Sequence, residues 1–404
     1  MKSLKIYISL TTIMLYAMFI AMFRPEILQP NVQVVFRIAF LGLTLIYILL
    51  TTNIREYWNV ALPLSLCVFL SSFINYKDGL LNYSNFLNGT LRAMCIYCLY
   101  IMFSKVVKQK GAHALLVYLH RLLSLYAIIS VISIFWVVRD QNGLYFFGSK
   151  YTTTYLLIFY SGVTFCLYED RIKQSLYYKI KYLFIYLIVG LSIAYTGCVT
   201  GVVTYAAFFV LSFAGDQIKR ILTKPHVVVL CMIGALLLLL SLQAVLQNEL
   251  VKDIIINILH KDLTLTDRLR YYNRAAFVIQ NGNLFWGYGY ASELMRSNIG
   301  LGTNLQNGLL HMIAEYGGVT VIVLLISTFY LTRNNFKTAY WGMYMALYTF
   351  IIASIVEVSY QLVFYSILFL VHLLQKEETA GYYGIGVTSY STKRRHFSVR
   401  WKSI

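Results

Sequence analysis

The chain has 404 residues, of which 59% are hydrophobic and 12% charged, with a mean hydropathy of +0.66 and a formal net charge of +18. Soluble globular domains carry about 25% charged residues, so this composition excludes an ordinary soluble enzyme. Several apolar runs, such as 6–23 and 227–242, approach or reach the roughly 20 residues that cross a bilayer as a helix. We therefore expect an all-α, polytopic integral membrane protein.

Apolar runs bounded by charged and turn residues predict about twelve membrane spans. Arg24 and Pro25 follow the first run where a signal peptide would have a small-residue cleavage site, so we interpret that run as a retained anchor. The stretch from 182 to 214 is too long for one span, and Gly197 and Gly201 are expected to supply a tight turn that divides it. The expected spans are 4–23, 33–52, 60–76, 86–104, 117–138, 152–168, 182–196, 199–214, 226–246, 309–331, 340–356 and 359–374.

Basic residues are distributed unevenly between the predicted loops. With a cytoplasmic N-terminus, most Lys and Arg fall in cytoplasmic segments, and the short outer loops hold only Arg24, Lys77, Arg139 and Lys150. Cytoplasmic loops of membrane proteins carry such an excess, so we expect both termini to be cytoplasmic. Much of the +18 charge is then a topology signal and an attraction to anionic membrane lipid, and it predicts no nucleic-acid partner.

The span map divides the chain into four parts. Residues 247–308 form a long outer loop, and long loops with their own pattern are usually functional. The parts are a bundle of the first nine helices at 1–246, this loop with short helices at 247–308, the last three spans at 309–374, and a basic cytoplasmic tail at 375–404.

Motifs for common cofactors and metals are absent from the sequence. It contains no P-loop, no HExxH, no GxSxG and no zinc-type spacing, so we expect neither a cofactor nor a metal. All six cysteines lie in apolar runs, including the CxxC pair Cys95 and Cys98, which we interpret as small packing residues and not as a redox pair.

The outer loop contains a predicted helix rich in arginine. Arg270 and Arg274 are four residues apart and share a face, with Arg268 in the first turn. Guanidinium groups and the free amides at a helix N-terminus both suit an anion such as a phosphate. The alternative is an interfacial helix whose arginines meet nearby aspartates and lipid headgroups.

An aromatic segment, NLFWGYGYAS, follows this helix. Trp286 and Tyr288 flank Gly287 and can stack on sugar faces. They also fit the belt of Trp and Tyr that membrane proteins place at the bilayer surface. Both interpretations stay open, and a lone GxG without a preceding strand does not predict a dinucleotide site.

His311 and Glu315 lie four residues apart where the loop returns to the membrane, so they share one helical face. A neutral imidazole oriented by a carboxylate can act as a general base. The alternative is a polar pair that faces neighbouring helices. Arg92, inside the span 86–104, is costly in lipid and is expected to face the bundle or a wet cavity, where it would anchor an anion.

Three short motifs between residues 180 and 372 together resemble one family group. YTGCVTGVVTYAAF is similar to a small-residue turn, TGSRTG, between two spans. TDRLRYYNRAAFVIQNGNLFWGYGYAS is similar to an arginine–aromatic helix followed by a plfGxGxG turn, and NLQNGLLHMIAEYGGVTVIVLL to an entry motif, HNxxLxxxxExGxxGl. Their order and placement resemble the O-antigen polymerase (Wzy) and O-antigen ligase families of bacterial envelopes. The matching positions are Arg268, Gly287, Gly289, Glu315 and Gly317.

Two positions depart from the family pattern. Val199 stands where the turn usually has an arginine, and Gln306 stands where a histidine usually precedes Asn307. In the ligases that histidine is thought to activate the acceptor hydroxyl, so its absence favours a polymerase. His311 has no counterpart in the pattern.

The resemblance implies a GT-C-like glycosyltransferase of the bacterial inner membrane, with its large loop in the periplasm. A polymerase of this kind transfers a growing glycan from undecaprenyl diphosphate to another lipid-linked repeat unit, which builds O-antigen or capsular polysaccharide without a cofactor. Its partners are the lipid-linked donor and acceptor, and a chain-length regulator is suggested as well. The alternatives are a ligase, which transfers polymer to lipid A core, and a flippase or transporter of lipid-linked saccharide.

Roles for the candidate residues follow from this interpretation. The catalytic candidates are His311, Glu315 and Arg268. The diphosphate is expected to meet the arginines Arg268, Arg270, Arg274 and Arg92, and the sugars are expected to meet Trp286, Tyr288 and Asn307.

Overall fold

The computed structural model describes residues 9–23, 25–26, 28–136, 144–240, 282–295, 305–333 and 340–383, together with residues 249, 253, 256–257 and 279. These residues are mostly helical. In chain order the named elements are α1 (Leu10–Met22), α2 (Pro30–Thr51), α3 (Ile54–Tyr57), α4 (Ala61–Lys77), α5 (Tyr83–Lys110), α6 (Ala112–Trp136), the antiparallel pair β1 (Leu144–Tyr145) and β2 (Gly148–Ser149), α7 (Lys150–Gln174), α8 (Leu176–Tyr195), α9 (Val199–Ser212), α10 (Asp216–Leu222), α11 (Pro225–Leu240), α16 (Gly308–Leu331), α17 (Trp341–Ala353) and α18 (Leu362–Tyr383).

Each predicted span overlaps one of these helices, and α3 and α10 are short helices between spans. By length and composition, five described helices (α2, α5, α6, α8 and α16) are able to cross a membrane, or six if the bent pair α10 and α11 counts as one span. The described part is therefore an all-α multi-pass membrane protein, as predicted. The number of twelve spans stays a prediction.

Two details differ from the map expected from the sequence: the role of Gly201 and the end of the last helix. Gly197 has a φ of +68° and joins α8 to α9. Gly201 instead lies inside α9, where a Cβ would come 2.8 Å from the Thr154 methyl group, so it serves close packing and not the turn. In addition, α18 continues to Tyr383, past the predicted start of the tail at residue 375, because the strong helix formers of QKEETA extend it.

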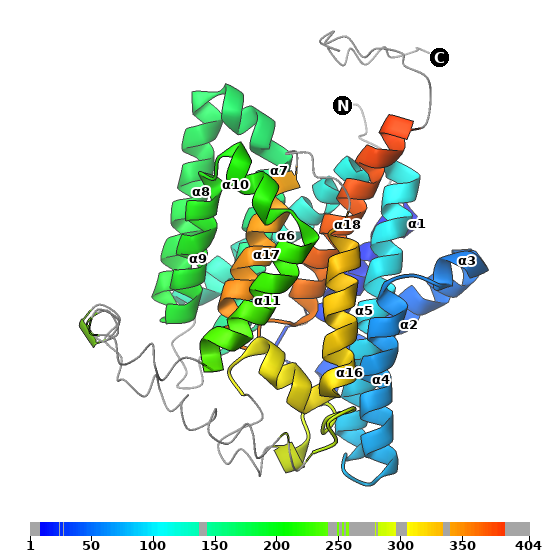
Figure 1. Cartoon of the computed structure of the whole chain (residues 1–404). Coiled ribbons are helices and arrows are strands. Elements are labelled where there is room, and N and C mark those ends of the chain that lie inside the picture. The colour runs from blue at the N-terminus through cyan, green and yellow to red at the C-terminus, as the bar shows by residue number, and fades with distance from the viewer. Residues whose placement is uncertain are drawn as a thin grey trace, which may run out of the picture.

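Two long helices, α5 and α7, organise the bundle. Helix α5 packs against α1, α4, α6 and α18, and α7 packs against α6, α8 and α17 (Figure 1). Helices α7 and α17 approach closely at Gly162 and Gly342, where a Cβ on either residue would meet the carbonyl oxygen of the other. Such small-residue contacts are typical of membrane helices, because lipid is as apolar as their side chains and close packing is what stabilises them.

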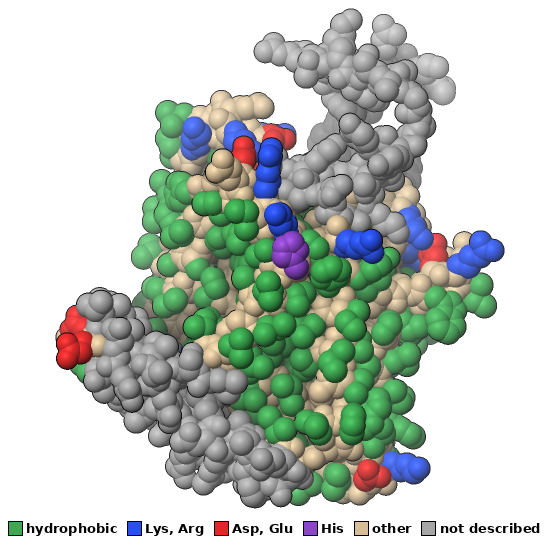
Figure 2. All heavy atoms as spheres, in the orientation of Figure 1, with side chains coloured by type: hydrophobic (Ala, Val, Ile, Leu, Met, Phe, Trp, Pro, Cys, Tyr) green, Lys and Arg blue, Asp and Glu red, His purple; other side chains and the backbone are tan. Residues whose placement is uncertain are grey.

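The surface separates into an apolar belt and a basic end. Leu50 of α2 is 80% exposed and Leu191 of α8 is 65% exposed, which suits helices that face lipid. Figure 2 shows apolar side chains over the middle of the described surface, and Lys and Arg gathered mainly toward the end of the bundle where α8 and α10 lie. This end carries the basic excess that predicted a cytoplasmic side.

Candidate active site

Helix α16 is broken at Gly317, whose φ of 82° and ψ of 169° lie outside the helical region. A regular helix would pair the N–H of Gly318 with the carbonyl of Ala314. Instead, Gly318 donates to the Leu284 carbonyl at 2.8 Å, and Ala314 accepts from the N–H of Tyr288 at 2.8 Å. Unpaired backbone groups are costly inside a membrane, so the break requires these partners from outside the helix.

The partners come from residues 282–291, the segment that carries the aromatic GYG sequence. The N–H of Gly289 donates to the Glu315 carbonyl at 2.8 Å. Gly287 and Gly289 have φ values of 64° and 80°, and a Cβ at Gly317 would collide with the Phe285 carbonyl. Glycines on both sides therefore allow the two backbones to approach closely. Figure 1 shows α16 as two pieces, with this segment near the shorter one.

Helix α4 holds the same junction through two polar side chains. Ser71 Oγ lies 2.6 Å from the Trp286 carbonyl oxygen and 3.2 Å from that of Glu315, and Asn75 Nδ2 donates to the Gly287 carbonyl at 3.2 Å. These two residues were not among those predicted from the sequence. Their signal was a pair of polar residues one helical turn apart in an apolar run.

His311 and Glu315 form a buried pair just before the break. Glu315 Oε1 accepts from the N–H of Ala291 at 3.0 Å, and Glu315 Oε2 lies 3.2 Å from His311 Nε2. A neutral imidazole that donates from Nε2 to the carboxylate leaves Nδ1 as a proton acceptor. Nδ1 is buried and has no hydrogen-bond partner in the described part of the chain.

Arg92 of α5 joins this pair from a neighbouring helix. Its guanidinium carbon lies 5.7 Å from the ring centre of Tyr290 and 5.8 Å from that of Tyr316, and Nη2 donates to the Tyr360 carbonyl at 3.2 Å. Arg92 also interacts electrostatically with Glu315. Its Nε atom is buried and has no partner among the described residues. The structure thus brings together three of the sequence-predicted residues.

The three residues predicted to contact sugar have different environments. Trp286 is half-buried. Tyr288 is only 4% exposed and packs with Met295, Leu305 and Leu310, so its ring is not free to stack on a sugar in this conformation. The close docking of its segment turns the ring into a small apolar cluster, and its contact with sugar stays a prediction.

Asn307 is also a structural residue in this conformation. It is 1% exposed, and its Oδ1 accepts from the N–H of Leu310 at 3.0 Å, which caps the start of α16. Its Nδ2 donates to the Ile355 carbonyl at 3.2 Å. The amide thus joins α16 to the turn after α17, and its contact with sugar stays a prediction.

The remaining predicted site residues are Arg268, Arg270 and Arg274, and these lie outside the described residues. No group of three or more His, Cys, Asp or Glu residues that could hold a metal ion occurs in the described part. Cys95 and Cys98 are buried inside α5 and form no disulfide with a described residue, in keeping with the packing role expected for them.

The fold and this cluster define a multi-pass helical membrane protein that holds ionisable side chains inside its bundle. Such residues are expensive in a membrane and commonly mark functional sites. Comparison of the chain with protein-family models, curated proteins and solved structures gives no match. The resemblance to the polymerase and ligase families rests on the sequence motifs.

Proposed function

We propose that this protein is a glycan polymerase of the bacterial inner membrane, which transfers a growing glycan from undecaprenyl diphosphate to a sugar hydroxyl of a second lipid-linked repeat unit. One observation carries the proposal. The imidazole of His311 is held at Nε2 by Glu315, whereas its buried Nδ1 has no partner among the described residues. Buried polar atoms are nearly always hydrogen-bonded, so this nitrogen indicates a missing partner, and an acceptor hydroxyl has the right chemistry.

The packing of the motifs supports the same proposal. The GYG turn and the entry motif are two of the three segments that carry the resemblance, and they share backbone hydrogen bonds at Gly289 and Glu315. Gly287, Gly289 and Gly317 all lie at this contact. Four of the five matching residues lie in the described part, and they belong to one local structure, as residues of a common site would.

In the proposed reaction, His311 Nδ1 accepts the proton of the acceptor hydroxyl. The hydroxyl oxygen forms a bond to the anomeric carbon of the donor sugar, and the bond from that carbon to the diphosphate oxygen breaks. The electron pair of that bond leaves on the diphosphate. Glu315 stabilises the imidazolium ion and fixes the tautomer. Both oxygens of Glu315 already have partners, so we assign it this positioning role and assign the base to His311.

The leaving diphosphate requires positive charge nearby. Arg92 is suited to this task, because it lies in the same cluster and its Nε is not engaged by a described residue. From the sequence we add Arg268, Arg270 and Arg274, whose guanidinium groups match phosphate oxygens. Arg268 is also the loop arginine of the resembled motif.

The two alternatives have less support. A ligase would use the same donor, but Gln306 replaces the histidine of its motif. A transporter predicts basic residues along one path through the bundle. Two buried lysines of the described part instead face separate groups: Lys105 donates to Thr51, and Lys219 lies 3.9 Å from Glu169.

A deletion strain tests the proposal through the glycans it makes. Loss of a polymerase is expected to leave single repeat units on the lipid A core, whereas loss of a ligase would leave long polymer on its carrier. Complementation with the wild-type gene restores long chains, and complementation with His311→Ala does not. The exposed His226 provides the matched control, since His226→Ala is expected to restore long chains. Full-length polymer from membrane-inserted His311→Ala would refute the assignment of the base.

A further inference from the structure

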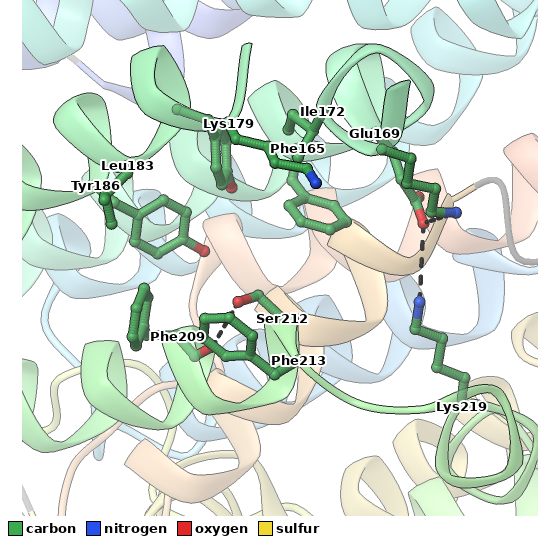
Figure 3. A pocket seen from close by; sticks show the side chains of 12 residues that line it. Phe165, Glu169, Ile172, Lys179, Leu183, Tyr186, Phe209, Ser212, Phe213 and Lys219 are labelled. Atoms are coloured by element: carbon green, nitrogen blue, oxygen red, sulfur yellow. Dashed lines mark hydrogen bonds and ion pairs between the residues drawn. The ribbon is translucent and has the colours of Figure 1, made fainter. Parts of the chain in front are cut away.

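A cavity lies at the basic end of the bundle, away from the start of α16 (Figure 1). It has a volume of about 550 Å³, is partly open, and is lined by α7, α8, α9 and α10. Phe165, Tyr186 and Phe209 form much of its wall (Figure 3). The proposed polymerase chemistry uses none of these residues.

The cavity is lined by more positively than negatively charged side chains. Lys173, Lys179 and Lys219 face a single acid, Glu169. Glu169 lies 2.9 Å from Lys173 Nζ and 3.9 Å from Lys219 Nζ. One carboxylate neutralises one ammonium group, so the cavity keeps an excess of positive charge and attracts an anion.

Lys219 is the most buried of these lysines, at 6% exposure. Its ammonium group lies 3.9 Å from Glu169 and 5.9 Å from the ring centre of Trp341, and both distances exceed those of a hydrogen bond. Its donors therefore lack close acceptors in these two contacts. Figure 3 shows Lys179 and Lys219 reaching into the cavity from different sides.

An apolar groove continues from this cavity along α8 and α9. A neighbouring hollow of about 290 Å³ shares Leu183, Tyr186 and Phe209 with the cavity and extends to Gly190 and Leu191. At 1.5 Å per residue, Lys179 to Leu191 covers about 18 Å of α8. That length is close to the thickness of the hydrocarbon layer of one leaflet, about 15 Å.

We propose that this groove binds one anionic phospholipid, with its phosphate between Lys179 and Lys219 and one acyl chain along α8 and α9 toward Gly190. The lysines attract the phosphate by charge, and the apolar wall of the groove packs against the acyl chain. Basic pockets between membrane helices bind anionic headgroups in this way. Inorganic phosphate has no acyl chain to bury in the groove, so it is expected to bind more weakly than the lipid.

Native mass spectrometry of the full-length protein tests the proposal. Delipidated protein is titrated with phosphatidylglycerol or with phosphatidylcholine that has the same acyl chains. We expect one saturable phosphatidylglycerol, bound at least about fivefold more tightly than phosphatidylcholine, the factor expected for one basic group near an anionic headgroup. Equal binding of the two lipids, or displacement of phosphatidylglycerol by millimolar inorganic phosphate, would overturn it.

Two variants sharpen this test. Lys179 is exposed, so Lys179→Ala should fold and weaken phosphatidylglycerol about fivefold. Arg220→Ala on α10 removes the same charge from an exposed residue that does not line the cavity, and it should leave binding unchanged. Gly190→Leu fills the groove and should weaken long-chain phosphatidylglycerol but not the dihexanoyl form. Equal effects of the two charge variants, or equal effects of Gly190→Leu on both chain lengths, would contradict the proposed site.

Discussion

Gly318 donates its backbone N–H to the carbonyl of Leu284, a residue of the preceding loop, at 2.8 Å. A continuous helix would have paired it with Ala314, whose carbonyl accepts from Tyr288 instead. The loop segment thus completes the hydrogen bonding of a membrane helix. This exchange fixes the position of Glu315, and through it that of His311, relative to the loop.

The break in α16 makes a clear prediction about stability. Gly317→Ala places a side chain at a φ of +82° and against the Phe285 carbonyl, so we expect it to destabilise the protein by about 2–3 kcal/mol or more. Gly318→Ala is the matched control, because its Cβ would meet only the Leu284 carbonyl at 3.3 Å. Thermal unfolding in detergent should show a lower Tm for Gly317→Ala than for Gly318→Ala. Equal Tm values would show that the break is not required.

Glu315→Gln is expected to preserve the fold while it impairs the reaction. A Gln side chain still offers an oxygen to the N–H of Ala291, but its amide hydrogens now face His311 Nε2. The imidazole then moves its proton to Nδ1, which can no longer accept one. We expect polymer formation by purified protein to fall about 10²–10⁴-fold with little change in Tm. A variant of near wild-type activity would remove Glu315 from the mechanism.

The arginines of the outer loop provide a test of diphosphate binding. Arg268→Ala should abolish long polymer chains while the protein still inserts in the membrane, because the leaving group loses its cation. Arg296→Ala, a charge loss elsewhere in the same loop, serves as the control and should leave chain length unchanged. Glycan gels of complemented deletion strains measure both. Full-length polymer from Arg268→Ala would contradict the assigned role.

The hydrogen bonds from α4 also predict a measurable effect. Asn75→Ala leaves the Gly287 carbonyl without its side-chain donor inside the protein, and we expect a loss of about 1–3 kcal/mol of stability. Asn88→Ala on α5 removes only an exposed side-chain hydrogen bond to its own helix and should cost much less. Chemical denaturation measures the free energy of unfolding of both variants. Similar losses would mean that α4 does not hold the junction.

The membrane orientation is testable by cysteine labelling. The native cysteines of the described part are buried or half-buried, so the background with a membrane-impermeant maleimide should be low. Asp78→Cys, in the exposed turn after α4, should react in intact spheroplasts. Gln174→Cys, at the exposed end of α7, should react only after lysis. The reverse pattern would invert the topology and place the His311 cluster on the cytoplasmic side.

Much of the fold was predictable from the sequence because lipid imposes simple rules. Apolar runs gave the positions of the helices, and the uneven distribution of Lys and Arg matches the basic end of the bundle. The spacing of His311 and Glu315 predicted a shared face, and the structure confirms that they are paired. The periodicity within one segment indicates which of its side chains share a helical face.

Contacts between distant segments were not predictable in the same way. Nothing in the run around Ser71 and Asn75 indicates which backbone atoms these side chains meet. Tyr288 was expected at a sugar site because aromatic residues stack on sugars, but docking of the loop buries it. The Gly-Gly pair at Gly317 does not predict the break, because an intact helix tolerates glycine at a cost of about 1 kcal/mol per residue.

The order of the segments along the chain has a consequence for biosynthesis. The partners of the backbone at the break, from Ser71 on α4 to Leu284 and Tyr288 in the loop, precede Ala314 in the sequence. Translation therefore releases these donors and acceptors before α16 leaves the ribosome. When the interrupted span enters the bilayer, the partners of its break have already been synthesised. Its backbone groups at the break can therefore form hydrogen bonds at once, without a later part of the chain.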